Sequence, residues 1–265
     1  YHKDASYLIV NDSLKALQSW AKHHRSKFNL PVLAIAGSYG KTIVKEWIYH
    51  FLRNEYNIIR SPKSYNSKLG IALSLLTINE SHDLAIIETA VSKPGEMKFL
   101  KDIIKPTHSI ITSFKINLTK KFQNQTDLKK EINILTSDIK SFTASSKINN
   151  DIENNHQIIN SNSSAIHQNI ILKINNIPTE FTIPFKNITA LSNFTSCINF
   201  LINWGVSIER LQLLSKSLPN VALRLETSKG INHSIVINDN YNADLSSIKI
   251  ALEAVKSENK TNQTI

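Results

Sequence analysis

A short apolar run at residues 32–36 ends on a glycine, and the chain then reads Gly37-Ser38-Tyr39-Gly40-Lys41-Thr42 before a segment of helical periodicity at 43–54. We call residues 37–42 the phosphate loop. Glycines allow backbone N–H groups to approach phosphate oxygens, and a helix that begins behind them adds the positive end of its dipole. In such a loop Lys41 can reach the outer phosphates of a nucleotide, and the Thr42 hydroxyl can join a magnesium ion.

The loop is shorter than the usual phosphate-binding motif, which needs a further glycine at the position that Ile35 occupies here. The competing interpretation is an ordinary turn between a strand and a helix that contains Gly-Lys-Thr. Strand, loop and helix follow one another in the order that phosphate binding requires, so we favour a nucleotide site.

The bulk composition limits the class of protein. The chain has 265 residues and is 41% hydrophobic, which is enough for a sizeable core in one or two domains. Met97 is the only methionine, so we expect residue 1 not to be a natural start and the chain to be an excerpt or a processed product. Neither a signal peptide nor an apolar run of membrane-spanning length is visible. The single Cys197 excludes an internal disulfide and fits a reducing cytoplasm.

The net charge of +10 raises the question of nucleic-acid binding. Asn, Ile and Lys are abundant while Arg, the usual residue for phosphate and base contacts, is scarce, and the basic residues are spread along the chain. We therefore attribute the positive net charge to compositional drift rather than to nucleic-acid binding. Anionic small-molecule substrates are a further set of partners that this charge would suit.

Strands and helices alternate through the first half of the chain. Strands are predicted at 32–36, 57–59, 83–88 and 109–112, with helices at 14–27, 43–54, 71–76 and after Pro94. The adjacent His23 and His24 of the first helix are interpreted as surface residues. The alternation predicts an α/β fold with a mostly parallel sheet and helices on both of its faces.

Two polar features lie where such a sheet binds ligands. Asn66 belongs to the loop 61–70 at the exit of the second strand, the edge at which α/β proteins hold their ligands. Glu88 ends the third strand, and in phosphate-loop enzymes an acid at such a position commonly completes the magnesium site. An ordinary strand-end acid is the alternative for Glu88.

The second half of the chain has a more mixed pattern. It predicts helices at 126–139, 189–205, 208–218 and 244–256, short strands at 140–144, 157–160 and 235–237, and a hairpin of 166–174 with 179–184 joined at Asn175-Asn176. The strands of this half predict a small β-rich extension beside the parallel sheet.

Five segments in this order resemble the ATP-dependent Mur ligases of peptidoglycan synthesis. They are Gly37–Thr42, Ser64-Tyr65-Asn66-Ser67-Lys68-Leu69-Gly70, the run from Ile87 to Met97, Arg224-Leu225-Glu226, and Asn238-Asp239-Asn240-Tyr241-Asn242-Ala243-Asp244. The segments are most similar to the members that add D-alanyl-D-alanine to UDP-N-acetylmuramoyl-tripeptide (UDP-MurNAc-tripeptide), in the form that is fused to an alanine racemase domain.

The resemblance implies three domains. Residues 1–30 would be the tail of an N-terminal UDP-sugar-binding domain with a linker helix, 31–234 the central ATP-binding domain, and 235–265 the start of a truncated C-terminal ligase domain. It also implies a cytoplasmic enzyme that uses ATP and Mg²⁺, binds UDP-MurNAc-peptide and D-alanyl-D-alanine, and neither binds nucleic acid nor inserts in a membrane. ATP would phosphorylate a peptide carboxylate, and an amine would then attack the acyl phosphate.

Roles for single residues follow from the same resemblance. Lys41, Glu88 and Arg224 would be catalytic, with Thr42 and Glu88 as the metal ligands and Asn66 lining the substrate cleft. The nucleotide would be held by the loop residues and three later positions, namely Gly37, Ser38, Gly40, Lys41, Thr42, Asn193 at the adenine, Arg224 at the phosphates and Asp239 at the ribose. Surface positions in a linker are the alternative for Arg224 and Asp239.

The chain departs from the family at a second metal site. Alignment on Phe122 places Ile116 at a family glutamate and Leu118 at a family histidine, and the best register places Ile132 at a lysine that is carbamylated in relatives, with Lys129 and Lys130 out of step. Isoleucine and leucine cannot ligate magnesium. Two further hypotheses therefore stand beside a working ligase: an ATP-binding relative that has lost ligase activity, and an unrelated phosphate-loop kinase or ATPase, which the later motifs disfavour. We also expect the excerpt alone not to form the amide bond, because most of the third domain is absent from it.

Overall fold

The computed structural model describes residues 4, 6–112, 122, 125–137, 139, 141–144, 157–163, 167–185, 188–222, 224, 226–241, 248–249, 251–252 and 255. The predictions at Ile116 and Leu118 lie outside these residues. The predicted helix 244–256 is described only in part, with helical backbone at 248–249, 251–252 and 255.

The centre of the molecule is a sheet of five strands in the order β2-β3-β1-β4-β5. Its members are β1 (Val32–Ala36), β2 (Ile58–Arg60), β3 (Leu84–Glu88), β4 (His108–Ile111) and β5 (Ser141–Ala144). Each neighbouring pair is parallel, so all five strands end at the same edge. The parallel sheet predicted from the alternation of elements is confirmed.

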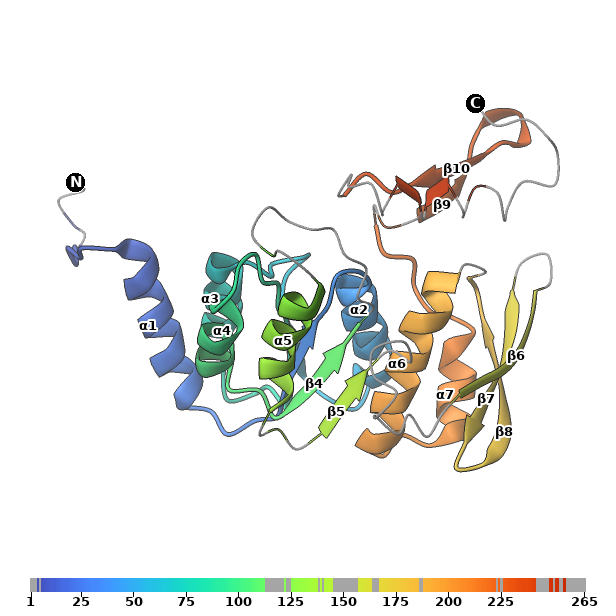
Figure 1. The fold of residues 1–265 in the computed structure, drawn as a ribbon, viewed down its shortest axis with the longest axis horizontal. Helices are drawn as coiled ribbons and strands as arrows, with labels where there is room; N and C mark the ends of the chain where they lie inside the picture. The colour runs from blue at the N-terminus through green and yellow to red at the C-terminus, as the bar shows by residue number, and fades with distance from the viewer. Residues whose placement is uncertain are drawn as a thin grey trace.

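Helices cover both faces of this sheet (Figure 1). On one face lie α1 (Ser13–Ser26), α3 (Lys68–Leu76), α4 (Glu96–Ile104) and α5 (Gln125–Thr136). On the other lie α2 (Lys41–Leu52), α6 (Ile188–Trp204) and α7 (Ile208–Ser215). None of the helices in the described part of the chain is both long and apolar enough to cross a bilayer.

The central strand β1 is apolar at every position because both of its faces are covered. Successive side chains of a strand point to opposite faces. Leu33 and Ile35 accordingly pack with α2 and α6 in one core, whereas Val32, Ala34 and Ala36 pack with α3, α4 and α5 in the other. A strand covered on both faces needs apolar residues throughout, as the run at 32–36 has.

Outside α7 lies an antiparallel sheet of three strands, β6 (Gln157–Ser163), β7 (Gln168–Ile174) and β8 (Ile177–Ile183). β7 and β8 form the predicted hairpin, and Asn175 and Asn176 at its turn both have positive φ, 48° and 67°. Asparagine tolerates this backbone better than most residues, which is why Asn-Asn serves as the two-residue loop. Strand β6 is longer than predicted.

A further pair of strands, β9 (Glu226–Lys229) and β10 (Ile235–Asn238), is antiparallel and flanks a short 3₁₀ turn at Ile231–His233. β10 agrees with the predicted strand at 235–237, but β9 was not predicted. Its sequence, Glu-Thr-Ser-Lys, has no apolar alternation, so the strand depends on its partner rather than on its own pattern.

The first helix is fastened to the rest of the fold by its C-terminal end. Asp12 caps its N-terminus by accepting a hydrogen bond from Lys15 N. Arg25 is buried and donates to the carbonyl oxygens of Phe28, Leu30, Ile104 and Lys105. His23 is exposed and His24 is partly exposed, in agreement with their interpretation as surface residues, and a ring nitrogen of His24 lies 2.8 Å from Ile78 O.

Candidate nucleotide site

The phosphate loop connects the C-terminal end of β1 to the first turn of α2. Gly37 and Gly40 have φ of 127° and 88°, a region that side chains other than glycine rarely enter. Gly40 is the N-cap of α2, so the helix begins at Lys41, two residues before the predicted start. The loop therefore presents its backbone at a helix N-terminus, as phosphate binding requires.

Both glycines also lie against neighbouring elements. A Cβ atom on Gly37 would overlap with Thr112, the residue that follows β4, and a Cβ atom on Gly40 would overlap with the side-chain amide of Asn193 on α6. The two glycines are thus required by backbone conformation and by close packing together. Asn193, predicted at the adenine, lies directly behind the loop.

Lys41 is half-buried and folds back over its own loop. Its Nζ donates to Gly37 O at 2.8 Å and to Ser38 O at 3.3 Å. Loss of solvent lowers the pKa of Lys41, the Glu88 carboxylate opposes this shift, and the positive charge of Arg224 adds to it. The structure thus places Lys41 within the electrostatic reach of two other predicted site residues.

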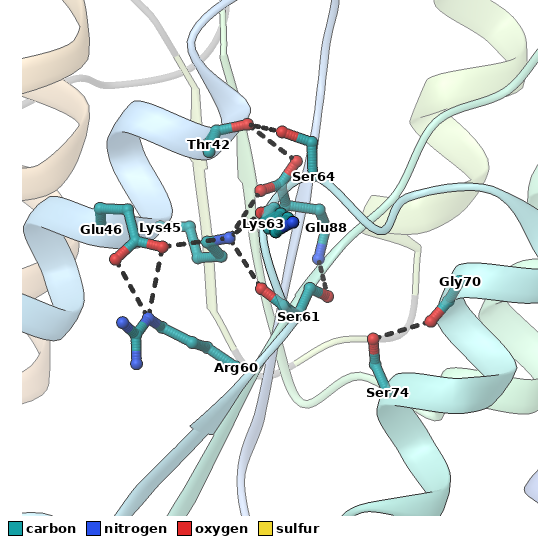
Figure 2. A network of polar contacts seen from close by, with 10 residues as sticks. All are labelled: Thr42, Lys45, Glu46, Arg60, Ser61, Lys63, Ser64, Gly70, Ser74 and Glu88. Atoms are coloured by element: carbon teal, nitrogen blue, oxygen red, sulfur yellow. Dashed lines mark hydrogen bonds and ion pairs between the residues drawn. The ribbon is translucent and has the colours of Figure 1, made fainter. Parts of the chain in front are cut away.

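Thr42 and Glu88 meet at the base of the loop. Thr42 Oγ1 donates to Glu88 Oε2 at 3.2 Å and also lies 2.9 Å from Ser64 Oγ (Figure 2). The two predicted metal ligands therefore come from α2 and from the end of β3, and parallel strand order brings them together. Hydroxyl and carboxylate oxygens are ligands that Mg²⁺ accepts.

The surroundings of the Glu88 carboxylate show whether a cation fits beside Thr42. Glu88 is fully buried, and its Oε1 has no hydrogen-bond donor among the described residues. Lys45 Nζ lies 3.1 Å away as an ion pair, but the contact does not have hydrogen-bond geometry. This carboxylate is paired with one ammonium group and lies beside the Thr42 hydroxyl, and its remaining lone pairs suit a hard cation that would take its other ligands from phosphates and water. Within the described ranges no group of three or more His, Cys, Asp and Glu side chains could hold a metal by itself.

Two buried donors beside the loop are open as well. Asn193 Nδ2 and Arg224 Nε have no hydrogen-bond partner in the part of the chain that the structure describes. The Arg224 guanidinium lies 4.0 Å from the centre of the Tyr241 ring, which supports it from one side. Buried polar atoms are nearly always paired, so two such donors beside one loop favour a polar ligand there.

The remaining predicted residues are placed less closely. Asp239 is half-buried and follows β10, and the pairing of Asn238 with Glu226 brings it to the same end of β9–β10 as Arg224. Asn66 is half-buried in the loop between β2 and α3, and its carbonyl accepts a hydrogen bond from Ala90 N at 3.2 Å, just beyond Glu88. The described contacts do not bring the Asn66 side chain to the phosphate loop.

The predicted loss of a metal ligand at Ile132 falls on a described position. Ile132 lies on α5 and is buried in the apolar core with α3 and α4. Lys129 is half-buried and Lys130 is exposed on the same helix. The preceding residue, Glu131, is buried and accepts hydrogen bonds from Gly95 N and Met97 N, so it caps the start of α4.

Sequence reasoning missed Lys45, which contacts Glu88 from below the loop. The available signal was its spacing: Lys41, Lys45, Ile48 and Leu52 follow one another at helical intervals along one face of α2. A lysine on the buried face of a helix needs a partner, and Glu88 is the acid that the sequence predicts at this edge of the sheet. Ser64, whose hydroxyl lies beside that of Thr42, was missed in the same way.

Comparison with known proteins shows which family this chain resembles. A sequence profile of the Mur ligase middle domain matches residues 35–213. The UDP-N-acetylmuramoyl-tripeptide–D-alanyl-D-alanine ligase of Rickettsia prowazekii is 30% identical over 283 residues, covering 97% of this chain and 62% of the relative. The chain thus spans about three fifths of the length of the curated relatives that it matches along most of its length.

Solved structures agree with the sequence comparison in their fold. MurF from Acinetobacter baumannii superimposes with a TM-score of 0.84 at 20% identity, covering 98% of this chain and 62% of the other. MurF ligase from Thermotoga maritima, solved in complex with ADP, gives a TM-score of 0.72 at 19% identity, with 96% and 64% covered. The phosphate loop, the sheet order and the profile match together lead to one conclusion: this chain belongs to the Mur ligase family, and its residues 35–213 match the middle domain of that family.

Proposed function

We propose that this chain forms the ATP-binding part of a ligase that adds D-alanyl-D-alanine to UDP-MurNAc-tripeptide during the synthesis of peptidoglycan precursors. The observation that supports it most strongly is the polar environment of the phosphate loop: Thr42 and Glu88 meet at its base, and the buried donors Asn193 Nδ2 and Arg224 Nε have no hydrogen-bond partner among the described residues. The names of the sequence relatives supply the substrates, and the ADP in the Thermotoga maritima complex agrees with a nucleotide at this loop.

The proposed roles of the site residues follow from the chemistry of their side chains. Phosphoryl transfer to a carboxylate is dominated by charge on the transferring group, so cations and positioning carry the catalysis. Lys41 would leave its loop carbonyls to bind the outer phosphates, and Arg224 would add a second positive charge. Thr42 and Glu88 would hold Mg²⁺, which neutralises charge on phosphate oxygens when it is bound.

The other assignments are part of the same proposal. Asn193 would bind the adenine end of the nucleotide, Asp239 the ribose, and Asn66 the peptide substrate. Residues 1–30 would belong to the tail of a UDP-sugar domain and its linker helix, 31–234 to the ATP-binding domain, and 235–265 to the start of the ligase domain. A fused alanine racemase and a cytoplasmic location are also proposed, and the free buried thiol of Cys197 agrees with a reducing compartment.

Ile132 favours a second candidate, a nucleotide-binding relative that no longer ligates. An isoleucine in the core offers no oxygen to a second metal. The two candidates differ in turnover rather than in binding. If it is a ligase, a protein that contains this chain should form ADP over many turnovers only when both UDP-MurNAc-tripeptide and D-alanyl-D-alanine are present, because the amine must consume each acyl phosphate. Binding of ATP without any such ADP formation would favour the second candidate.

The nucleotide site itself is tested by calorimetric titration of ATP with Mg²⁺. Lys41→Ala should weaken binding at least about tenfold, because hydrogen bonds to charged groups contribute about 1.5–3 kcal/mol. Lys15→Ala, which alters an exposed lysine of α1, should bind as the unaltered chain does. Absence of heat from ATP in a folded sample would refute the nucleotide site and with it the proposed ligase.

A further inference from the structure

Lys45 is a fully buried lysine one helical turn beyond Lys41. Its ammonium group lies 2.7 Å from Ser61 O and contacts Lys63 O, both in the loop that follows β2. It also lies 3.1 Å from Glu88 Oε1 and 3.2 Å from Glu46 Oε1. Figure 2 shows Lys45 reaching from α2 to the centre of this network, below Thr42.

A charge at this position is costly by itself. Removing an ammonium group and a carboxylate from water costs several kilocalories per mole for each ion, and apolar residues of similar volume often serve the stability of a core equally well. The neighbours of Lys45 on α2, Val44 and Ile48, are such core residues. The stability of the fold alone therefore does not explain a lysine here.

The contacts of Lys45 suggest what the charge does. Glu88 is 0% exposed, so it has no water to stabilise its charge or its orientation. Lys45 approaches the carboxylate at Oε1 while the Thr42 hydroxyl approaches it at Oε2, and together they determine how the group is turned. By binding Ser61 and Lys63, the same ammonium group also holds the loop that places Ser64 beside Thr42.

Lys45 cannot take the role proposed for Lys41, which is to contact the phosphates directly. Lys41 is half-buried at the surface of the phosphate loop, whereas the Lys45 side chain has no exposed surface and all the partners described above surround it. Any effect of Lys45 on a bound nucleotide must therefore pass through the groups that it touches.

We propose that Lys45 is a positioning residue of the nucleotide site: its buried ammonium group holds the Glu88 carboxylate and the loop 61–64 in the arrangement that receives Mg²⁺ with ATP. The inference rests on the proposed nucleotide site and assigns it a residue that does not touch the nucleotide. Partners of metal ligands orient the ligands, and their loss typically lowers metal affinity by about 10–100-fold.

The test compares ATP binding with and without Mg²⁺. Calorimetry in the presence of Mg²⁺ and in the presence of EDTA gives two affinities, and their ratio is the magnesium increment. Lys45→Met, which keeps the length of the side chain and removes its charge, should reduce this increment about tenfold. Affinity for ATP in EDTA should stay within about twofold, since Lys45 acts through a metal ligand.

Four further variants, one of them a double substitution, test whether the effect of Lys45 passes through Glu88. Glu88→Gln should remove most of the magnesium increment, and adding Lys45→Met to it should change the increment by less than about twofold, because residues that act through one group are not additive. Glu46→Gln removes the other carboxylate that contacts Lys45 and should leave the increment unchanged. Lys22→Met on α1, which breaks an exposed ion pair with Asp102 of α4, serves as a matched control for the loss of a lysine.

The outcomes separate the inference from the proposed function. If the unaltered chain binds ATP with a magnesium increment and folded Lys45→Met retains that increment, the inference is wrong while the nucleotide site stands, even if thermal unfolding shows a loss of stability. If the unaltered folded chain does not bind ATP, the proposed function is wrong, and the inference is wrong with it. Should Lys45→Met not fold, Lys45→Gln, which can still donate to the Ser61 and Lys63 carbonyls, decides by the same criterion.

Discussion

Asn193 of α6 lies against Gly40 of the phosphate loop so closely that a Cβ atom on Gly40 would overlap with its side-chain amide. Its Nδ2 is buried without a hydrogen-bond partner among the described residues. The amide therefore supports the loop from behind and keeps one donor open beside it. This contact joins two segments that are far apart in the chain.

Gly40→Ala should abolish measurable ATP binding or weaken it at least about tenfold, because the new methyl group displaces either the loop or Asn193 and an ordinary side chain is strained at φ of 88°. Calorimetric titration with Mg²⁺ and ATP measures the change.

Gly95→Ala is the matched control for Gly40→Ala. Gly95 is also the N-cap glycine of a helix, with φ of 84°, but a Cβ atom there would meet nothing within 4 Å. It shares the backbone strain without the contact, so ATP binding should be retained. Equal loss of binding in both variants would show that strain rather than the Asn193 contact matters.

Arg25→Met should lower the free energy of unfolding by about 3 kcal/mol, because the substitution leaves buried carbonyl oxygens of Ile104 and Leu30 without their donor. Urea unfolding followed by circular dichroism gives the value. Lys27→Met changes an exposed residue at the same end of α1 and should shift it by less than about 0.5 kcal/mol. A loss below that limit for Arg25→Met would mean that α1 is not anchored by this residue.

Glu96 should make stability depend on pH. Burial by itself raises the pKa of its carboxyl group, but hydrogen bonds from Ser92 and Lys93 and the contact with Lys68 outweigh burial and lower the pKa below its ordinary value of 4.5. A lowered folded-state pKa contributes stability that is present above pH 4.5 and is lost as the pH falls through the folded value.

Glu96→Gln should therefore lower the free energy of unfolding by about 2 kcal/mol at pH 7 and by progressively less below pH 4.5, as the carboxyl group of the unaltered chain becomes protonated. Urea unfolding at a series of pH values measures this difference. Glu80→Gln, at an exposed position, should follow the unaltered chain at every pH. A difference for Glu96→Gln that does not shrink in acid would contradict the role of its charge.

Phe181→Ala should lower the free energy of unfolding by about 3–5 kcal/mol, since Phe181 is 1% exposed and packs edge-on against Phe194 of α6. Ile177→Ala on the same strand, at a position that is 66% exposed, should cost less than about 0.5 kcal/mol. Chemical denaturation of both variants tests whether the β6–β8 sheet shares the core with α6. Similar small losses would indicate that the sheet unfolds independently.

The elements near the phosphate loop could be predicted because their signals are local. The apolar run before Gly37, the helical spacing after Thr42 and the Asn175-Asn176 turn each depend on a few neighbouring residues, and the structure has them at or within two residues of the predicted places. The carboxylate at Glu88 was predictable for a related reason, because parallel strands bring their ends to one edge. β9 could not be predicted, since only its pairing with β10 makes it a strand.

What the sequence by itself determined is the phosphate loop between β1 and α2, the α/β architecture, and the residue types able to bind a nucleotide. Only the tertiary structure decided which of these side chains meet and which other residues support them. Asn193 behind Gly40, Lys45 beneath Glu88 and the buried Arg25 each depend on contacts between distant segments. The physical reason is that the cost of a buried charge or amide depends on its partners, and no local pattern contains those partners.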